Sequence, residues 1–303
     1  MIETAKPMDL LQRFSFPGLP IRGQWIRLTA TLGAIARYQN YPPDVQALLG
    51  EMFAAVTMVA DNLKFSGAVS LQSQGDGALS RSLAECREQQ YLRGIAQLAE
   101  NVGPSPNTGN LVDWLGNGQL ALSLLPDKAT GMNPYQGLVA IDPRGLSRSL
   151  EGYFQNSEQL QTRLHFASAG GATTGLLLQR LPDAPNASET AVAQAQDDWQ
   201  TLTTLAASVT ETELATLPPE QMLNRLFHEY PCTLYSPRNL SFRCTCSVEK
   251  SDETLMVLGR EDLLALASEQ PEIHVDCEFC GRRYAYDQNA VKELLAKRAA
   301  ALH

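Results

Sequence analysis

The sequence of 303 residues contains no long apolar run. No stretch reaches the roughly 18 consecutive apolar residues that a membrane-spanning helix requires. The first residues, 1–7, also lack the basic and then apolar pattern of a signal peptide. The sequence therefore predicts a cytoplasmic protein without a membrane partner, in a compartment where thiols are normally reduced.

Positive charge is scarce as well. The chain has 24 Lys and Arg against 33 Asp and Glu, which gives a net charge of −9 and a pI near 5.0. No dense run of Lys or Arg is present, and an acidic chain without a basic patch repels a phosphate backbone. Nucleic acid is therefore not an expected partner.

The motifs of common enzyme classes are missing too. Neither the phosphate-binding loop G-x-x-x-x-G-K-[ST] nor the nucleophile elbow G-x-S-x-G occurs. The chain has only four histidines, and none lies in a recognisable catalytic pattern. We therefore predict no catalytic residues and no enzyme. The open alternative is a thiol oxidoreductase that uses Cys277 and Cys280, which would reduce insulin.

What is present is the composition of a globular protein, with 44% hydrophobic and 19% charged residues. Residues 1–180 predict one α+β domain. A helix is expected from Pro43, because apolar residues follow it at helical spacing from Val45 to Val59. A second helix is expected over residues 146–154. Strand-like runs outnumber helices without alternating regularly with them, which favours mainly antiparallel sheets; they lie at residues 64–72, 91–97, 119–125, 136–141, 163–168 and 175–181.

Residues 181–231 predict an acidic, mostly helical linker. Eight acidic residues accompany a single Arg in residues 181–230. Thr210 and Glu213 fit a capping box, and Pro219 suits a first helical turn. The apolar positions form one stripe along this segment. A helical subdomain that simply completes the core is an equally open interpretation.

The last part, residues 232–303, contains two tight cysteine pairs. Cys244 and Cys246 form a C-x-C, and Cys277 and Cys280 form a C-x-x-C followed by Gly281. Two short-spaced pairs can supply the four thiolates that tetrahedral Zn²⁺ prefers, and Gly281 can take the left-handed conformation of such a turn. We predict one zinc ion per chain in a small metal-dependent domain, which ends in a helix over residues 287–302.

Four thiolates leave no open coordination position, so this zinc would be structural rather than catalytic. A disulfide within a C-x-C closes a small strained ring, and strained disulfides are labile or regulatory. The centre is therefore interpreted as a reversible redox sensor. His274 is expected to lie outside the ligand set, and Cys86 and Cys232 lie outside both pairs.

Together with these cysteines, other segments resemble those of a known family. The chain is similar, over nearly its whole length, to the bacterial 33-kDa heat-shock protein family of redox-regulated holdase chaperones. The segments that carry the resemblance are residues 63–67, 71–77, 93–94, 116–118, 135–137, 153–160, 244–247 and 277–281.

The resemblance implies an N-terminal chaperone core (1–180), the linker (181–231) and a zinc-binding redox-switch domain (232–303). It implies an ATP-independent chaperone that is inactive when reduced and zinc-bound. Oxidation would pair Cys244 with Cys246 and Cys277 with Cys280 and release zinc. The C-terminal domain and linker would then unfold and expose a surface for unfolded or partly folded clients under heat and oxidative stress.

The resemblance allows a homodimer on activation, which no periodicity of this sequence indicates, and it assigns no role to Cys86 or Cys232. A nucleic-acid-binding zinc ribbon is the remaining alternative, because Arg282 and Arg283 follow the second pair and could contact phosphate. Salt-sensitive binding in a retardation assay would distinguish that class.

Overall fold

The computed structural model describes residues 9–63, 66–100 and 111–301. It divides into two compact units, an N-terminal unit, Met1–Arg243, and a C-terminal unit, Cys244–His303. The segment examined for a signal peptide (1–7), the predicted strand residues Lys64 and Phe65 and the predicted helix residue Leu302 lie outside the described residues. No helix in the described ranges combines the length and apolar character needed to cross a membrane.

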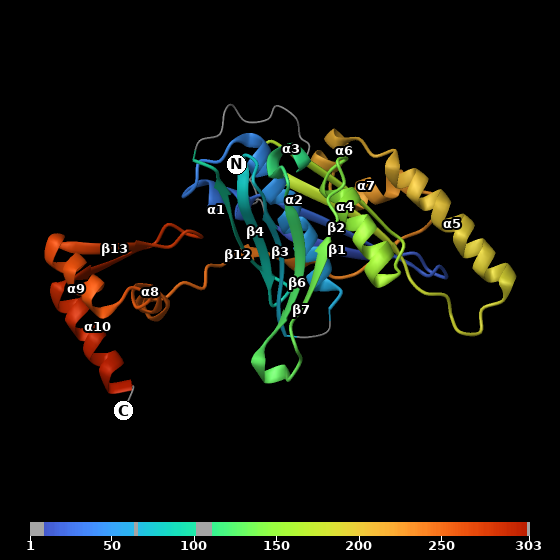
Figure 1. Ribbon diagram of the computed structural model, residues 1–303. Helices are drawn as coiled ribbons and strands as arrows, with labels where there is room; N and C mark the ends of the chain where they lie inside the picture. Colours follow the sequence, from blue (N-terminus) through green and yellow to red (C-terminus); the bar gives the residue numbers. More distant parts are fainter. Residues whose placement is uncertain (1–8, 64–65, 101–110, 302–303) are drawn as a thin grey trace. The chain divides into compact units, whose positions relative to one another are not determined.

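The N-terminal unit is built on two sheets, which are antiparallel except for one short pairing (Figure 1). Sheet A has the order β10-β1-β2-β9-β8, and β11 also pairs with β1. Its longer strands are β1 (Leu10–Ser15), β2 (Ile21–Leu28), β8 (Thr162–Ala169) and β9 (Ala172–Arg180). Sheet B has the order β12-β5-β4-β3-β6-β7, with β3 (Gly67–Gln74), β4 (Leu79–Arg87), β5 (Tyr91–Leu98), β6 (Gln119–Pro126) and β7 (Tyr135–Val139). The predicted α+β class with mainly antiparallel sheets is confirmed.

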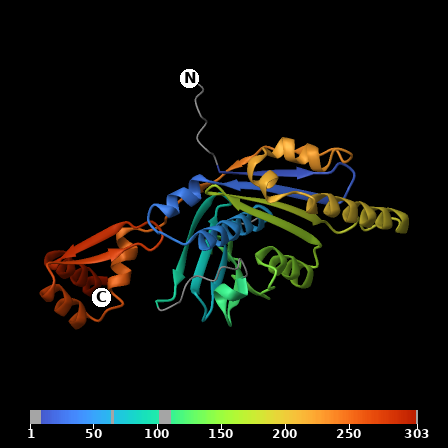
Figure 2. The ribbon, with the colours of Figure 1, turned by 90° about the horizontal axis from the view of Figure 1, so that it is seen from above.

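Helix α2 (Pro43–Asp61) packs between the two sheets, where Figure 2 shows it in blue. It begins at Pro43, as the sequence predicted, because proline suits the first helical turn. Its middle is buried all round, with Phe53, Val56 and Met58 fully inside, since both sheets contact it. The remaining short helices of this core are α1 (Ala30–Ala36), α3 (Leu111–Leu115), the 3-10 turn η1 (Lys128–Thr130), α4 (Leu146–Tyr153) and the π-helical turn η2 (Phe154–Glu158).

The linker region forms three helices, α5 (Glu189–Ala207), α6 (Glu211–Thr216) and α7 (Pro219–Leu226). The predicted capping box is confirmed: the Glu213 amide donates to Thr210 Oγ1 at 3.2 Å, and the Thr210 amide donates to Glu213 Oε2 at 3.0 Å. Pro219 begins α7, also as predicted. Short-range signals therefore define the ends of these helices.

The apolar stripe of the linker is buried against sheet A, on the face opposite α2 (Figure 2, gold helices). This second core, which we call the linker core, contains an aromatic cluster in which Phe16 lies 5.2 Å from Phe227 between ring centroids. Its buried members from both sides are Phe14, Phe16, Ile21, Trp25, Ala167, Leu176, Leu178, Trp199, Leu202, Ala206, Leu214, Ala215, Met222, Leu223, Leu226 and Phe227. In this conformation the linker helices complete a core against sheet A. An acidic helical linker with one apolar stripe and a helical subdomain that completes the core, the two interpretations of the sequence, therefore describe the same packing.

After the linker, the chain crosses the N-terminal unit in three two-residue strands. These are β10 (Thr233–Leu234) and β11 (Arg238–Asn239), which pair with β1, and β12 (Ser241–Phe242), which pairs in parallel with β5. Residues 233–243, here called the crossover segment, therefore belong to the N-terminal compact unit. The division into domains at residues 180/181 and 231/232 stays a prediction.

The C-terminal unit is a small α+β fold. It contains α8 (Val248–Leu255), α9 (Arg260–Glu269), the hairpin of β13 (Glu272–Asp276) and β14 (Arg283–Asp287), and α10 (Gln288–Ala301). Among the residues whose side chains the structure describes, its buried core comprises eight: Leu255, Leu263, Ala267, Ile273, Tyr286, Val291, Leu294 and Leu295. A core of this size contributes little net stability, so a metal crosslink is a reasonable requirement for folding.

Glu51, on α2, gives the N-terminal unit a pH-dependent stability. Burial, and then the charge of Glu211 on α6, raise its pKa from 4.5 to about 7. The folded state therefore binds the extra proton between these values, and stability falls as pH rises from 4.5 through 7. Between pH 5.5 and pH 8 the free energy of unfolding should fall by an amount on the order of 2 kcal/mol because of Glu51. We expect the Glu51→Gln variant not to show this fall.

Urea unfolding at pH 5.5 and pH 8, followed by tryptophan fluorescence, measures this effect in the N-terminal unit, because Trp25, Trp114 and Trp199 all lie there. Glu220→Gln, at an exposed position of α7, serves as the control. If the free energy of unfolding changes with pH equally in the Glu51→Gln variant and in the unaltered protein, Glu51 is not the source of the pH dependence.

Candidate metal centre

The first cysteine pair lies in the loop that precedes α8. The Cys246 amide points at Cys244 Sγ at 3.4 Å, so the backbone turns tightly around the first sulfur. Ser247 then caps α8, since its hydroxyl accepts from the Lys250 amide at 3.3 Å. The Lys250 ammonium donates to the Thr245 carbonyl at 2.7 Å, which ties the loop back to the helix.

The second pair lies at the turn of the β13–β14 hairpin. The Cys277 amide donates to the Arg282 carbonyl at 2.9 Å, and the Gly281 amide donates to the Cys277 carbonyl at 2.8 Å. Gly281 has a φ of 66°, the left-handed conformation predicted for it. This turn brings both sulfurs of the C-x-x-C to the same side of the hairpin end.

The four sulfur atoms of Cys244, Cys246, Cys277 and Cys280 lie within 4.8 Å of one another. The sulfurs of Cys244 and Cys277 lie 3.6 Å apart, and those of Cys246 and Cys280 lie 3.5 Å apart. A tetrahedral zinc site with Zn–S bonds of about 2.3 Å requires sulfurs about 3.8 Å apart. The donor set and its spacing therefore fit one zinc ion, and four cysteines can hold a metal here.

The thiols of this cluster differ in acidity. Burial raises the pKa of Cys244 above its ordinary value. For Cys246 burial also acts to raise the pKa, but the neighbouring Tyr284 hydroxyl and the other thiols outweigh it and lower the pKa to about 7. A bound divalent cation favours the thiolate form of every ligand, so loss of protons accompanies metal binding.

One of the two arginines that follow the second cysteine pair is held by a carboxylate. Arg283 makes two bonds to the Asp276 carboxylate, at 2.7 and 2.8 Å, so its charge is neutralised. His274, which was expected to lie outside the ligand set, contacts Glu272 at 3.1 Å, and the cluster consists of the four cysteines. This arrangement gives no support to the nucleic-acid alternative.

The two remaining cysteines lie in the N-terminal unit, outside the cluster. Cys86 is fully buried on β4, and burial raises its pKa to about 12. Cys232 is half-buried at the edge of the linker core, and burial raises its pKa to about 11. Both thiols are therefore protonated near neutral pH, and they are poor targets for oxidants, which attack the thiolate.

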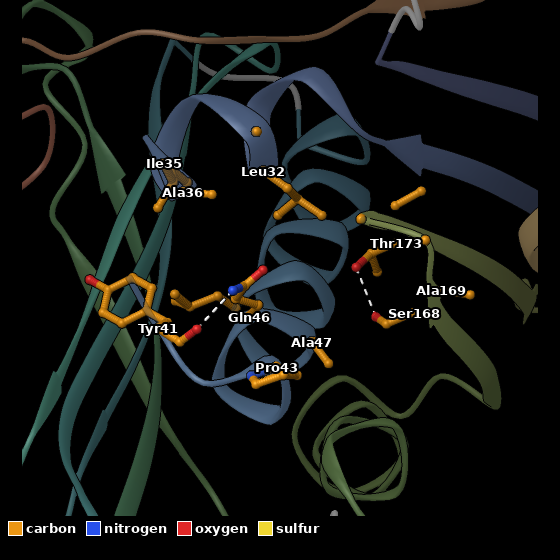
Figure 3. Close-up of a pocket in the computed structure, with 15 residues that line it drawn as sticks. Leu32, Ile35, Ala36, Tyr41, Pro43, Gln46, Ala47, Ser168, Ala169 and Thr173 are labelled. Atoms are coloured by element: carbon orange, nitrogen blue, oxygen red, sulfur yellow. Dashed lines mark hydrogen bonds between the residues drawn. The ribbon is translucent and has the colours of Figure 1, made fainter. Parts of the chain in front are cut away.

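A cavity of about 260 Å³ lies in the N-terminal unit between α1, α2 and the β8–β9 turn (Figure 3). Its walls are mostly apolar. The polar side chains on its rim already have partners: Gln46 donates to the Tyr41 carbonyl at 2.7 Å, and the Ser168 and Thr173 hydroxyls share a 2.8 Å bond. The cavity offers apolar surface and no nucleophile with an adjacent base.

Sequence reasoning found all four clustered cysteines but missed two of their supports. Lys250 was not distinguishable from an exposed helix lysine, and its bond to Thr245 depends on the loop conformation. Tyr284 approaches Cys246 only because β14 pairs with β13 in the observed register, in which it stands opposite Val275. Neither residue belongs to a spacing pattern that could have been recognised.

Comparison with known proteins gives a consistent result. The family model described as "Hsp33 protein" matches residues 9–287. A 33 kDa chaperonin of Nitrosococcus oceani is 36% identical over 293 residues, covering 97% of this chain and 96% of the relative. Another, of Pseudomonas savastanoi, is 38% identical over 289 residues, covering 95% and 94%. The crystal structure of the 33 kDa chaperonin from Thermotoga maritima superposes with a TM-score of 0.80 at 18% identity, covering 96% and 99%, which shows the same fold.

Proposed function

This chain belongs to the Hsp33 family, which supports a chaperone role, and from that premise we propose that it is an ATP-independent holdase switched on by oxidation. The observation that carries the proposal is the linker core. Within the N-terminal unit, the linker helices bury an apolar face that stays covered only while they remain packed on sheet A.

In the reduced state, Cys244, Cys246, Cys277 and Cys280 would hold one zinc ion. Zinc, when bound, supplies a structural crosslink between the loop before α8 and the β13–β14 turn. The rest of the C-terminal unit has only the small core described above, so its folding would depend on that crosslink. The reduced chain would therefore be the inactive form.

Oxidation would pair Cys244 with Cys246 and Cys277 with Cys280. Each disulfide forms when one thiolate attacks a peroxide and becomes a sulfenic acid, whose sulfur is then attacked by the neighbouring thiol with loss of its oxygen as water. Two thiols and one peroxide thus give one disulfide and two waters. All four sulfurs lie within 4.8 Å of one another, and a disulfide needs about 2.05 Å, so the proposed pairing requires each pair of sulfurs to move together. Zinc release and loss of the folded unit would accompany it.

Loosening of the linker would then uncover the linker core. Trp25, Phe14 and Leu176 on sheet A and the apolar faces of α5–α7 would become available together. A contiguous apolar patch of several hundred Å² is unusual on a soluble surface and marks an interaction site. We infer that it holds unfolded or partly folded clients during heat and oxidative stress, while the net charge of −9 keeps the complexes soluble.

The remaining assignments follow the same proposal. The protein would act in the cytoplasm, where reducing conditions keep the centre loaded with zinc until oxidants appear. Its partners would be non-native proteins rather than nucleic acid or membranes. Activation would include a homodimer, which sedimentation of reduced and oxidised protein would test.

The first test follows zinc release during peroxide treatment at mildly raised temperature, together with suppression of a client's thermal aggregation in the same samples. We expect about one zinc per chain to leave as suppression develops, and thiol reduction with added zinc to reverse both. If zinc stays bound, or leaves without any gain in holding activity, the cysteines form a purely structural site. The proposed activation by oxidation would then be wrong.

A further inference from the structure

The crossover segment connects the linker to the first cysteine. Helix α7 ends at Leu226, the crossover segment begins at Thr233, and Cys244 follows directly after its end. Any signal that travels along the chain from the cysteine centre to the linker must pass through these residues. The contacts that hold the segment in place therefore bear directly on the proposed switch.

The backbone pairing of this segment is sparse. Each of its three strands is two residues long, and the side chains of β10 are exposed. Single backbone bonds add to it: the Tyr235 amide donates to the Arg13 carbonyl at 3.0 Å, and the Leu240 amide donates to the Asp9 carbonyl at 2.9 Å. Such short pairings are only marginally stable by themselves.

One charged contact of the segment is buried. Asp61 is the last residue of α2, and its side chain is 0% exposed. Arg238 Nη2, from the crossover segment, lies 3.2 Å from Asp61 Oδ1. The other carboxylate oxygen accepts from Gln24 Nε2 at 2.9 Å and lies 3.8 Å from Nε of the half-exposed Arg13. Arg238 is thus the closest cation to this carboxylate among the described residues.

The Arg238 side chain is also held from its other side. Its Nη1 donates to Gln89 Oε1 at 2.6 Å. Gln89 lies in the turn between β4 and β5 with a left-handed φ of 60°, and its Nε2 donates to the Leu63 carbonyl at 2.8 Å. The guanidinium therefore bridges the end of α2 in the interior and a turn of sheet B.

We propose that the Arg238–Asp61 ion pair is a latch that keeps the crossover segment, and with it the C-terminal end of the linker, attached to the N-terminal unit. The latch rests on the proposed function. It explains how unfolding at Cys244 would be resisted before it reaches α7, because the segment must withdraw the partly exposed Arg238 cation from a fully buried carboxylate. Removing Arg238 leaves the buried Asp61 charge with a poorer partner, the more distant Arg13 at 3.8 Å, which is unfavourable.

Neutralising Asp61 provides the matched rescue. Gln24 Oε1 is a buried acceptor without a hydrogen-bond donor in the described part of the chain. An asparagine at position 61 has no charge to compensate, and its carboxamide oxygen can still accept from Gln24 Nε2 while its NH₂ group adds a donor beside the Gln24 side chain. The double variant Arg238→Met with Asp61→Asn should therefore restore the packing that Arg238→Met alone disturbs.

The test compares the full chain, reduced and zinc-loaded, with its R238M, R238M/D61N and R225M variants. Hydrogen exchange is measured by mass spectrometry in peptides covering residues 219–231 and 233–242, together with zinc content and client aggregation. We expect R238M to raise exchange at least about tenfold in both peptides with zinc retained, and to give holding activity without oxidant. R238M/D61N should return to the exchange of the unaltered protein.

R225M is the control for loss of an arginine, because Arg225 pairs with Glu213 at 2.8 Å in an exposed position of the linker. Exposed pairs contribute little, so its exchange should be unchanged. Unaltered exchange in R238M, or faster exchange that D61N does not reverse, overturns the latch. If oxidised protein never suppresses aggregation while the exchange results hold, the proposed chaperone function fails and the latch stands.

Discussion

Replacement of Cys277 by serine is expected to unfold the C-terminal unit without any oxidant. The change removes one of four thiolates, and zinc affinity should fall at least about a hundredfold, since even loss of outer contacts costs 10–100-fold. Zinc contributes about 10–16 kcal/mol to the folding of small zinc peptides. The eight-residue core of this unit cannot replace that contribution.

Zinc content after dialysis and limited proteolysis of the reduced variant measure this result. Cleavage should appear within α8 to α10, and the linker should become partly accessible, with a change in the fluorescence of Trp199, which is 3% exposed on α5. Cys232→Ser, the same substitution outside the cluster, should keep one zinc per chain and resist proteolysis. A Cys277→Ser variant with full zinc affinity and normal switching would refute the assigned centre.

A carboxylate placed in the linker core should release the linker while the zinc centre stays intact. Leu202 on α5 is 0% exposed and packs with the aromatic residues of sheet A. Loss of a buried leucine alone costs about 2–5 kcal/mol, and an unpaired buried charge adds to this. We therefore expect Leu202→Asp to suppress client aggregation in the reduced state, to nearly the level of the oxidised protein.

Thr204→Asp is the control, because it adds the same charge to an exposed position of the same helix. It should remain inactive until oxidised. Aggregation assays on both variants, with zinc content measured in the same samples, separate linker release from metal loss. If Leu202→Asp opens the linker without any holding activity, the client surface does not lie in the linker core.

The four-cysteine cluster could be recognised from sequence because its determinants are local. Cys244 with Cys246, and Cys277 with Cys280, each bring two thiols together from one turn, and Gly281 supplies the conformation that the second turn needs. Helices α2 and α7 were likewise predicted from their apolar spacing and their N-terminal prolines. These features depend on residues within a few positions of one another.

Strands β1, β2 and β4 were not predicted. Strand β2 reads IRGQWIRL, in which arginine and glutamine interrupt the apolar residues. Those polar side chains are accommodated by distant partners, such as Gln179 for Arg22 and Asp61 for Gln24. Sheet A is also buried on both faces, by α2 and by the linker helices, so the usual alternation of polar and apolar positions is lost.

The amino-acid sequence by itself determined the four-cysteine donor set, the capped linker helices and the mixed fold class, because short-range spacing encodes each of them. Only the tertiary structure decided that the linker stripe packs on sheet A and that Arg238 meets Asp61 beside Gln24 and Gln89. The physical reason is that a buried group finds its partner through strand register and helix packing. These join residues far apart in the chain, and no local pattern of residues records which of them will meet.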